Sequence, residues 1–527
     1  MLVALWLISS LPSVQAEHEH APNKDCPLPS DTDREYRFDL PAWVTRGGCI
    51  RERGHRECSR ILEAILDSLA KIREAEYASA ASVLSLLPTI GALFGPPTSE
   101  IWRLKSIVPF GGALAMSLSF GGALMPVNVE DYENAVAKGN TAIGSIISLR
   151  RHPPGSQKDV PNIDERLQEL SNKIRERIDR LESVRPPKKT LILGLVVMFI
   201  LFSMAQAAMA VVEQGGVINF LCSARYWMHM WYFLVTLAAF AEDRAHRPFN
   251  KTYKLYLSSL SYDVEILGGQ PISDYFSTST ATENALKQLK TLRPASMNFF
   301  GSSLQTPARN SVIVMVSIVG QQKWEQIGKR LSRVFSVAVF VMGTAVFASA
   351  TLLSLIMAVV VLTLTLAAGI FGRAIASWIV SNVAGTEPMI HIISGTKEEA
   401  YQAIAEILSL KSNDGSPFQV EINGQIFINE RRVASRSWLK VALFGVLAEP
   451  YDIAKPYQKT KMSSGAGMSL NPLSSGLTNT LRGGVSIPFL SSAADPSLPI
   501  HRTDNDAVKT VSQQSVPSIP PDNQPDN

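Results

Sequence analysis

"RVFSVAVFVMGTAVFASATLLSLIMAVVVLTLTLAAGIFGR", residues 333–373, places 39 uncharged residues between two arginines. As one straight helix at about 1.5 Å per residue, the stretch would be about 58 Å long, against a hydrocarbon core of about 30 Å. Two crossings need about 40 residues, and apolar character resumes after Arg373, whose side chain is then expected to reach the headgroups. We therefore expect a helical hairpin that bends at "ASAT", residues 348–351.

The composition indicates an integral membrane protein. Of 527 residues, 46% are hydrophobic and only 18% are charged, which is unusual for a soluble chain of this length. The net charge of +4 is near balance, and the basic residues are spread over several segments without forming a nucleic-acid-binding stripe. We expect the lipid bilayer and unidentified proteins as partners, and no nucleic acid.

The N-terminus is typical of a secretory signal peptide covering residues 1–16. Residues 2–11 are apolar, and "VQA" at 14–16 supplies the small residues that signal peptidase prefers, so the mature chain would begin at Glu17. An uncleaved anchor is the alternative.

A cleaved signal peptide places three cysteines in an oxidising lumen. Cys26, Cys49 and Cys58 are disulfide candidates, and one bridge among them is expected, although their spacing leaves the pairing open. The fourth cysteine, Cys222, falls in an apolar segment.

Further apolar segments complete a model with five spans. Residues 81–96 contain Pro88 and are too short to cross, so we expect a re-entrant or interfacial segment there. The connection "EQGGVIN" is only seven residues long, which makes the spans on either side antiparallel neighbours. The expected spans are residues 106–126, 190–212, 220–240 and the two legs of 334–383.

Basic residues predict the orientation of these spans. Residues 127–189 and 241–333 each contain 12 Lys and Arg, whereas "EQGGVIN" contains none. Because basic connections are retained in the cytosol, we expect the N-terminus outside and both long connections and the C-terminus inside. Asn250 argues for the reverse orientation, because Asn250-Lys251-Thr252 is a glycosylation sequon that is used only in the lumen.

The polar segments predict further local structure. Periodic apolar residues indicate amphipathic helices at 57–80 and 163–181, and Thr396 with Glu399 has the spacing of a capping box. In "FQVEINGQIFIN", residues 418–429, we expect a three-residue loop ending at Gly424, because it would place the apolar residues of both strands on one face. The segment beyond residue 455 is rich in Ser, Pro, Gly and Asn and is expected to be disordered.

The expected fold is mainly α: a multi-pass helical membrane protein with a small α+β cytosolic unit near the C-terminus and a disordered tail. Its parts are a signal peptide (1–16), a luminal segment with an amphipathic helix (17–80), a re-entrant segment plus the first span (81–126), a polar loop with an amphipathic helix (127–189), a two-span hairpin (190–240), a second polar loop (241–333), a second two-span hairpin (334–383), the α+β unit (384–455) and the tail (456–527).

Several blocks carry a resemblance to known proteins. "LLPTIGALFG", "FGGALAMSLSFGG", "GTAVFASATLLS", "LAAGIFGR" and "GVLAEPY", in this order between residues 57 and 451, resemble a family of uncharacterised fungal multi-pass membrane proteins. The resemblance implies an integral membrane location in the fungal secretory pathway and carries no activity. The chain departs from that family in its strand-turn-strand block, where Gln425 and Arg431 or Arg432 replace an expected histidine and cysteine.

The sequence contains little that predicts chemistry. We find no phosphate-binding loop, nucleophile elbow, zinc-protease or EF-hand motif, and we expect no enzymatic activity, cofactor or metal. Arg225 and His229 lie four residues apart in an expected span, where ionisable groups are candidates for an ion or proton path or for interfacial anchoring. The leading hypothesis is a non-enzymatic interaction or organising protein of the secretory pathway or plasma membrane, and the alternative is a channel or transporter.

Overall fold

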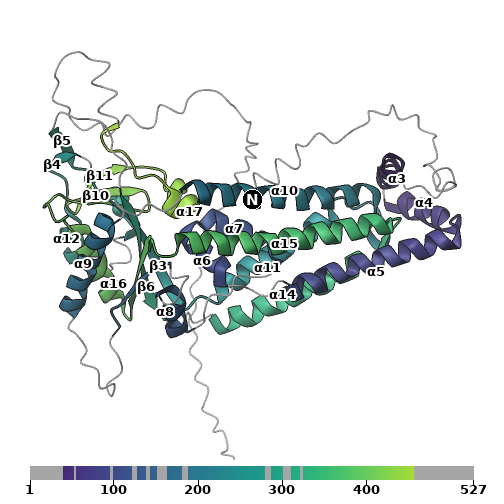
Figure 1. The fold of residues 1–527 in the computed structure, drawn as a ribbon, viewed down its shortest axis with the longest axis horizontal. Helices are drawn as coiled ribbons and strands as arrows, with labels where there is room; N and C mark the ends of the chain where they lie inside the picture. Colours follow the sequence, from purple (N-terminus) through teal and green to yellow (C-terminus); the bar gives the residue numbers. More distant parts are fainter. Residues whose placement is uncertain are drawn as a thin grey trace, which may run out of the picture. The chain divides into compact units, whose positions relative to one another are not determined.

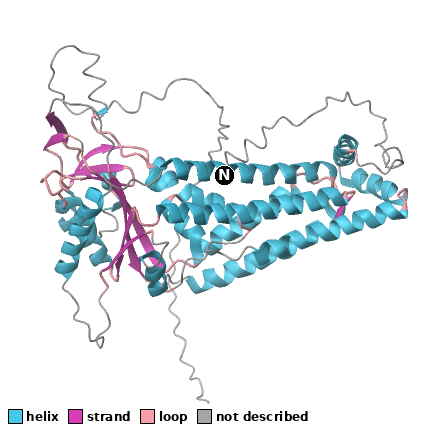
Figure 2. Ribbon diagram, in the orientation of Figure 1, coloured by secondary structure: helices cyan, strands magenta, loops and turns pink. Residues whose placement is uncertain are grey.

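The computed structural model describes residue 26 and residues 39–52, 55–94, 99–120, 128–137, 143–150, 163–180, 188–260, 262–278, 286–300, 310–320 and 325–455. The expected signal peptide at 1–16 and the expected tail at 456–527 lie outside the described residues. The described part is mainly helical and also contains a seven-stranded sheet (Figure 1, Figure 2).

Three helices are long and apolar enough to cross a membrane. They are α10 (Lys188–Gly215), the Ile327–Ala348 part of α14 (Glu325–Ala348), and α15 (Leu355–Val383). At about 1.5 Å per residue these segments are about 42, 33 and 44 Å long, which exceeds a hydrocarbon core of about 30 Å. α15 packs along α10, and the shorter α11 (Trp227–Ala245) packs along α14. These four helices form one bundle.

The apolar stretch at 333–373 forms two helices, with a turn at 349–354 between α14 and α15. Leu352 in this turn is buried and has a left-handed backbone conformation (φ of 56°). Its carbonyl accepts a hydrogen bond of 2.6 Å from Nε1 of Trp43, and β7 (Ala350–Thr351) in the same turn pairs with β2 (Val217–Ile218). These contacts fix a bend that has no Gly or Pro.

The helices before the bundle differ from the expectation. α4 (His55–Asp67) and α5 (Lys71–Phe94) replace the single amphipathic helix expected at 57–80, and α3 (Leu40–Glu52) precedes them. α5 continues through Pro88, so residues 81–94 of the expected re-entrant segment belong to a long helix. The helix packs against both α14 and α15, and this packing offsets the one backbone hydrogen bond that Pro88 cannot donate.

The span expected at 106–126 is a short helical hairpin over its described residues. α6 (Ser99–Ile107) and α7 (Pro109–Leu118) meet at Val108, where the proline that begins α7 interrupts the helical hydrogen bonds. The ten residues of α7 cover about 15 Å, half of the hydrocarbon core. Its C-terminal end lies inside the bundle, because the Tyr232 hydroxyl donates to the Ser117 carbonyl and Arg373 Nη2 donates to the Ser119 carbonyl at 3.2 Å. Arg373 therefore binds a helix end instead of reaching the headgroups.

The seven-stranded sheet has the order β1-β8-β6-β3-β9-β10-β11. Its β1–β8 and β8–β6 pairs are parallel and its other pairs are antiparallel. Three of its strands come from the two long connections between helices, so the strands after α15 belong to a larger sheet and are not a separate α+β unit at 384–455. The strands are β1 (Gly144–Ser148), β3 (Phe249–Ser258), β6 (Ser311–Val319), β8 (Met389–Ser394), β9 (Gln419–Ile422), β10 (Gln425–Ile428) and β11 (Arg431–Ser435).

Both faces of this sheet are covered. α9 (Ile163–Arg180) and α16 (Lys397–Ser409) share an apolar core with one face, and Thr396 and Glu399 form a capping box at the start of α16. The other face contributes Tyr256, Ile313 and Met389 to the core that also contains buried residues of the helical bundle. The sheet is thus attached to the bundle by a continuous apolar core.

The β9–β10 connection shows a consequence of this double coverage. Ile422 pairs with Gln425, so Asn423 and Gly424 form a two-residue turn, both with positive φ. The prediction of a three-residue loop at this position is therefore wrong. Phe418 and Val420 belong to the core under α9 and α16, whereas Ile426 and Ile428 pack on the opposite side. Apolar residues on both faces are stable because neither face is left to water.

The remaining elements are short. They are α8 (Val129–Ala137), η1 (Asn219–Leu221), β4 (Asp263–Leu267), α12 (Ile272–Thr278), η2 (Leu289–Thr291), β5 (Ser296–Phe300), α17 (Leu439–Phe444) and η3 (Gly445–Leu447). Of these, β4 and β5 pair with each other in a separate two-stranded sheet.

Candidate functional site

The helices α10, α11, α14 and α15 connect the same two ends of the bundle. We call one of them the sheet end, which comprises the seven-stranded sheet with α9 and α16. The other is the disulfide end, which comprises α3, α4, β2 and β7 together with two disulfide bonds.

The four cysteines of the chain form two disulfide bonds at the disulfide end. Cys26 is bonded to Cys49, and Cys58 is bonded to Cys222. The sequence predicts Cys26, Cys49 and Cys58 as disulfide candidates, whereas it places Cys222 in a span at 220–240. The structure begins α11 only at Trp227, because residues 217–226 form β2, η1 and a turn.

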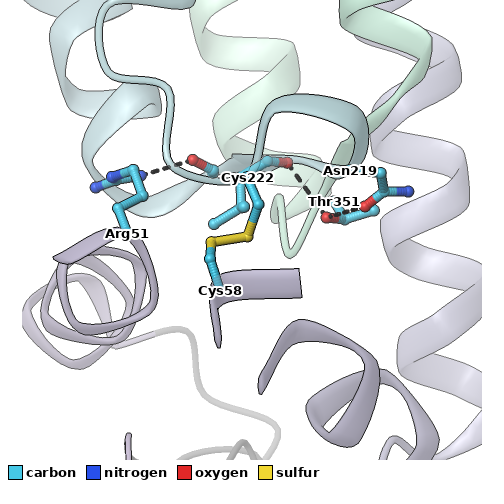
Figure 3. The surroundings of a disulfide bond; sticks show 7 residues. Arg51, Cys58, Asn219, Cys222 and Thr351 are labelled. Carbon is cyan, nitrogen blue, oxygen red and sulfur yellow. Dashed lines mark hydrogen bonds between the residues drawn. A yellow bond between two sulfur atoms is a disulfide. The ribbon is translucent and has the colours of Figure 1, made fainter. Parts of the chain in front are cut away.

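The Cys58–Cys222 bond joins α4 to the connection between α10 and α11 (Figure 3). Arg51 Nη1 donates to the Gly216 carbonyl at 2.8 Å, and Thr351 Oγ1 donates to the Asn219 side chain at 2.9 Å (Figure 3). Arg51 is buried, and its pKa is lowered to about 10, mainly by desolvation and to a smaller extent by repulsion from Arg225. The N-terminal helices therefore hold the ends of both helical hairpins together.

Arg225 and His229 do not act as a pair in this structure. Arg225 precedes α11, its side chain is 58% exposed, and its nearest carboxylate oxygen, on Glu52, is 3.9 Å away. His229 points into the bundle and is buried. The four-residue spacing predicted a common helical face, but α11 starts after Arg225, at a residue that follows Tyr226 in a left-handed conformation.

The partner of His229 is Glu213 in the last turn of α10. Nδ1 of His229 lies 2.5 Å from Oε2 of Glu213, and the backbone N–H of His229 donates to Oε1 at 2.9 Å. Both side chains are buried, and Nε2 of His229 has no hydrogen-bond partner among the described residues. Such a carboxylate–imidazole pair can hold or release a proton inside the protein.

Sequence reasoning missed Glu213 by one residue. The expected span ends at Val212, whereas α10 continues to Gly215 and so includes Glu213. The available signal was that Glu213 is the only charged residue between Lys189 and Arg225.

A second polar cluster lies where the sheet meets the bundle. His391 on β8 is buried, with Nδ1 at 2.7 Å from the Tyr132 hydroxyl and Nε2 at 2.7 Å from the Ser317 hydroxyl. The Ser317 hydroxyl is also 2.9 Å from that of Thr252. The pKa of His391 is lowered to about 3, mainly by burial and to a smaller extent by repulsion from Lys254, so its imidazole is neutral at physiological pH. Each ring nitrogen is satisfied, which makes this cluster a connector between α8 and three strands.

The glycosylation candidate Asn250 lies at the sheet end. It is the second residue of β3, its side chain is exposed, and the β3–β6 register shifts beside it. Within the described ranges, no group of three or more His, Cys, Asp or Glu residues could hold a metal ion. Comparison of the chain with protein-family models, with curated proteins and with solved structures finds no match.

Proposed function

We propose that the protein is an integral membrane protein of the secretory pathway or plasma membrane that binds or organises protein partners through the domain at its sheet end. One observation carries this proposal: strands from two separate interhelical connections and from the segment after α15 meet in one sheet. If the helices cross the bilayer, all three segments must lie on the same side of it. The chain then displays a folded domain at a fixed position on one membrane surface.

The charges and disulfides support a cytosolic sheet end. Lys188 and Lys189 begin α10, and Lys329, Arg330 and Arg333 lie in the first turns of α14, all at the sheet end. Basic residues beside spans are retained in the cytosol. Both disulfides lie at the other end, as expected for an oxidising lumen.

The same arrangement bears on the sequon. Asn250 and the disulfides lie at opposite ends of the bundle, so under this proposal they occupy opposite sides of the membrane. Disulfide formation and sugar transfer both require the lumen, so only one of the two can occur. We propose that the disulfides form and that Asn250 remains unmodified.

A glycosylation assay tests this topology. The wild-type chain should show no mobility change after glycosidase treatment. Asp25→Thr creates a sequon at Asn23, beside Cys26, and this variant should gain one sugar. Sugar on Asn250 of the wild-type chain would reverse the proposed orientation.

The partner role is tested by crosslinking in intact cells. Charge reversal at Arg175 on α9, a partly exposed residue of the sheet end whose Nε donates to the Lys411 carbonyl at 2.7 Å, should remove crosslinked proteins that the wild-type chain captures. The matched control is charge reversal at Glu63 on α4, which is exposed at the disulfide end. Equal loss in both variants, or no loss in either, contradicts a partner surface around Arg175 at the sheet end.

Proton-coupled transport is a second proposal, favoured by the buried Glu213–His229 pair. Glu213→Gln and His229→Gln remove the carboxylate and the imidazole and keep the size of each side chain similar. In proteoliposomes, both variants should lose a proton flux that Arg225→Gln retains, because Arg225 is exposed and separate from the pair. Unchanged flux in both variants rules out this role.

A further inference from the structure

A cavity of about 620 Å³ lies at the sheet end of the bundle, between the end of α11, the start of β3, the end of β6 and the start of α14. Its lining combines two arginines with apolar side chains, one serine and two glycines. The lining includes Arg244, Arg247, Phe249, Gly328, Leu331 and Phe335. None of the lining residues is acidic.

Two exposed apolar stripes lead to this cavity. On α11, Met230, Phe233 and Leu237 are 42–47% exposed at helical spacing, and the next turns of the helix contain Arg244. On α14, a second stripe begins at the cavity, because Leu331 both lines it and is 66% exposed. Its members are Ile327, Leu331, Val334, Val337 and Val341. If the bundle lies in a bilayer, such stripes on the neighbouring helices α11 and α14 are surfaces that lipid tails would cover.

The two arginines supply hydrogen-bond donors beside these stripes. Arg244 is exposed and has no hydrogen-bond or ion-pair partner in the described part of the chain. Arg247 is partly buried; one Nη donates to Asp243 Oδ2 at 3.0 Å, while its Nε has no partner among the described residues. The same Oδ2 accepts from Lys105 Nζ at 2.6 Å, so Asp243 is shared between two cations. The cavity wall therefore carries net positive charge.

The position along α14 fixes the depth of the cavity in a bilayer. Gly328 and Leu331 lie in the first turns of the candidate span that begins at Ile327, so the cavity is at the boundary between hydrocarbon and headgroups. At this depth a phospholipid has its phosphate next to its glycerol and the first methylenes of its tails. Basic pockets between membrane helices on the cytosolic side are typical sites for anionic lipid headgroups.

We propose that this cavity binds the headgroup of an anionic phospholipid from the leaflet at the sheet end. Arg244 and Arg247 donate to the phosphate oxygens, and Leu331 and Phe335 contact the glycerol and the tails. The proposal depends on the membrane embedding stated above but not on partner binding or transport. A phospholipid is the occupant, and not a soluble anion, because the cavity continues into surfaces that only lipid tails would cover.

The test uses the purified full chain in a neutral detergent, titrated with dioleoylphosphatidylserine and followed by native mass spectrometry. We expect one phosphatidylserine to bind in preference to dioleoylphosphatidylcholine. Arg244→Gln should weaken this binding about tenfold, the effect of one charge-assisted hydrogen bond. The matched control, Arg330→Gln, removes the same charge from an exposed residue of α14 outside the cavity, and its effect should stay below about threefold.

A second variant tests the cavity itself. A side chain added at Gly328 meets no atom within 4 Å at its Cβ, so Gly328→Leu should place a bulky side chain at the cavity without disturbing α14. This variant should keep the thermal midpoint of the wild-type chain and lose the bound lipid. Retained phosphatidylserine in Gly328→Leu overturns the proposal, as does an equal loss in Arg244→Gln and Arg330→Gln, which would indicate surface charge alone.

Two further outcomes separate the remaining explanations. Glycerophosphoserine has the same headgroup without tails, and if it displaces the lipid at equal concentration the site is one for soluble phosphate esters and the lipid proposal is wrong. A chain that stays monodisperse in buffer without detergent contradicts the membrane embedding itself. Solubility without detergent would therefore overturn the proposed function as well, whereas displacement of the lipid by glycerophosphoserine would leave the proposed function intact.

Discussion

Removal of the Cys58–Cys222 bond should destabilise the protein more than removal of the Cys26–Cys49 bond. A disulfide stabilises the folded state mainly by restricting the unfolded chain, and the effect grows with the length of the closed loop. Cys58 and Cys222 are 164 residues apart, which corresponds to about 5 kcal/mol, whereas Cys26 and Cys49 are 23 residues apart, which corresponds to about 3 kcal/mol. A span that persists in the unfolded state, such as α10, shortens the effective loop between Cys58 and Cys222, so the value for this bond is an upper limit.

The perturbation is Cys58→Ala with Cys222→Ala, and the control is Cys26→Ala with Cys49→Ala. Cys58 and Cys222 are fully buried, and alanine leaves no unsatisfied polar group in their place. The bond also holds α4 against the connection that contains β2, so its loss should loosen the β2–β7 pairing between the two helical hairpins. Hydrogen exchange at Val217 and Ile218 should therefore rise in the first double variant and stay unchanged in the second.

The assay is thermal or denaturant unfolding of the purified chain in detergent, together with thiol counting. The native wild-type chain should react with no maleimide, and the reduced and denatured chain with four. A first double variant that is as stable as the wild-type chain refutes the reasoning. So does a native Cys222 that reacts without reductant.

Three further predictions concern the interior. The folded-state pKa of His391, about 3, is below its unfolded value near 6.5, so its contribution to stability is complete above pH 6.5 and decreases as the pH falls toward 3. Unfolding measured at pH 7.5 and at pH 5 should therefore show a loss of about 2 kcal/mol at the lower pH, and this loss should be absent in His391→Gln. Gly343→Val should cost about 1–3 kcal/mol in the same assay, because a Cβ at Gly343 collides with the Trp231 ring, whereas Gly328→Ala should cost nothing. Arg436→Met should cost about 3–5 kcal/mol at pH 7 because it leaves the fully buried Glu421 unpaired, and the cost should shrink in acid, since burial raises the pKa of Glu421.

Hydropathy predicted the long helices because a span must satisfy its backbone internally and cover it with apolar side chains. The stretch between Arg333 and Arg373 therefore indicated two helices from its length alone. The limit of this reasoning appears at Pro109, where the apolar segment expected to cross as one helix instead contributes to α6 and α7. Hydropathy reports the surroundings of a segment, and the interior of a helical bundle is as apolar as lipid.

The sheet could not be predicted in the same way. β1 has five residues within a polar connection, and its partner β8 lies more than 240 residues further along the chain. Alternation of apolar residues failed at Asn423 and Gly424 because both faces of the sheet are covered, and alternation specifies register only where one face meets water. The capping box at Thr396 was predictable because it depends on residues three positions apart.

The candidate site follows the same division. His229 was visible as an ionisable group in an apolar segment, but its partner Glu213 comes from the other helix of the hairpin and its role depends on where each helix ends. Cys222 was visible too, but pairing with Cys58 required α11 to begin later than hydropathy suggested. The chemistry of single residues was therefore readable, and their partners were not.

The proposed topology places a requirement on α5. The helices α10, α11, α14 and α15 contribute four passages between the two ends, so they return the chain to the end from which it started. The chain reaches the sheet end before α10, although α3 and α4 are at the disulfide end, and this needs one further passage between the two ends.

α7 does not supply this passage, because the helix turns back into the bundle and is too short. α5 starts beside the disulfide end, where Tyr77 packs near Leu352, and α6 ends at the sheet end, where Ile107 contacts Gly445. Under the proposed topology, a fifth passage through α5 and α6 would place the disulfides in the lumen and the sheet in the cytosol. Its lower hydropathy is acceptable because α14 and α15 cover part of α5.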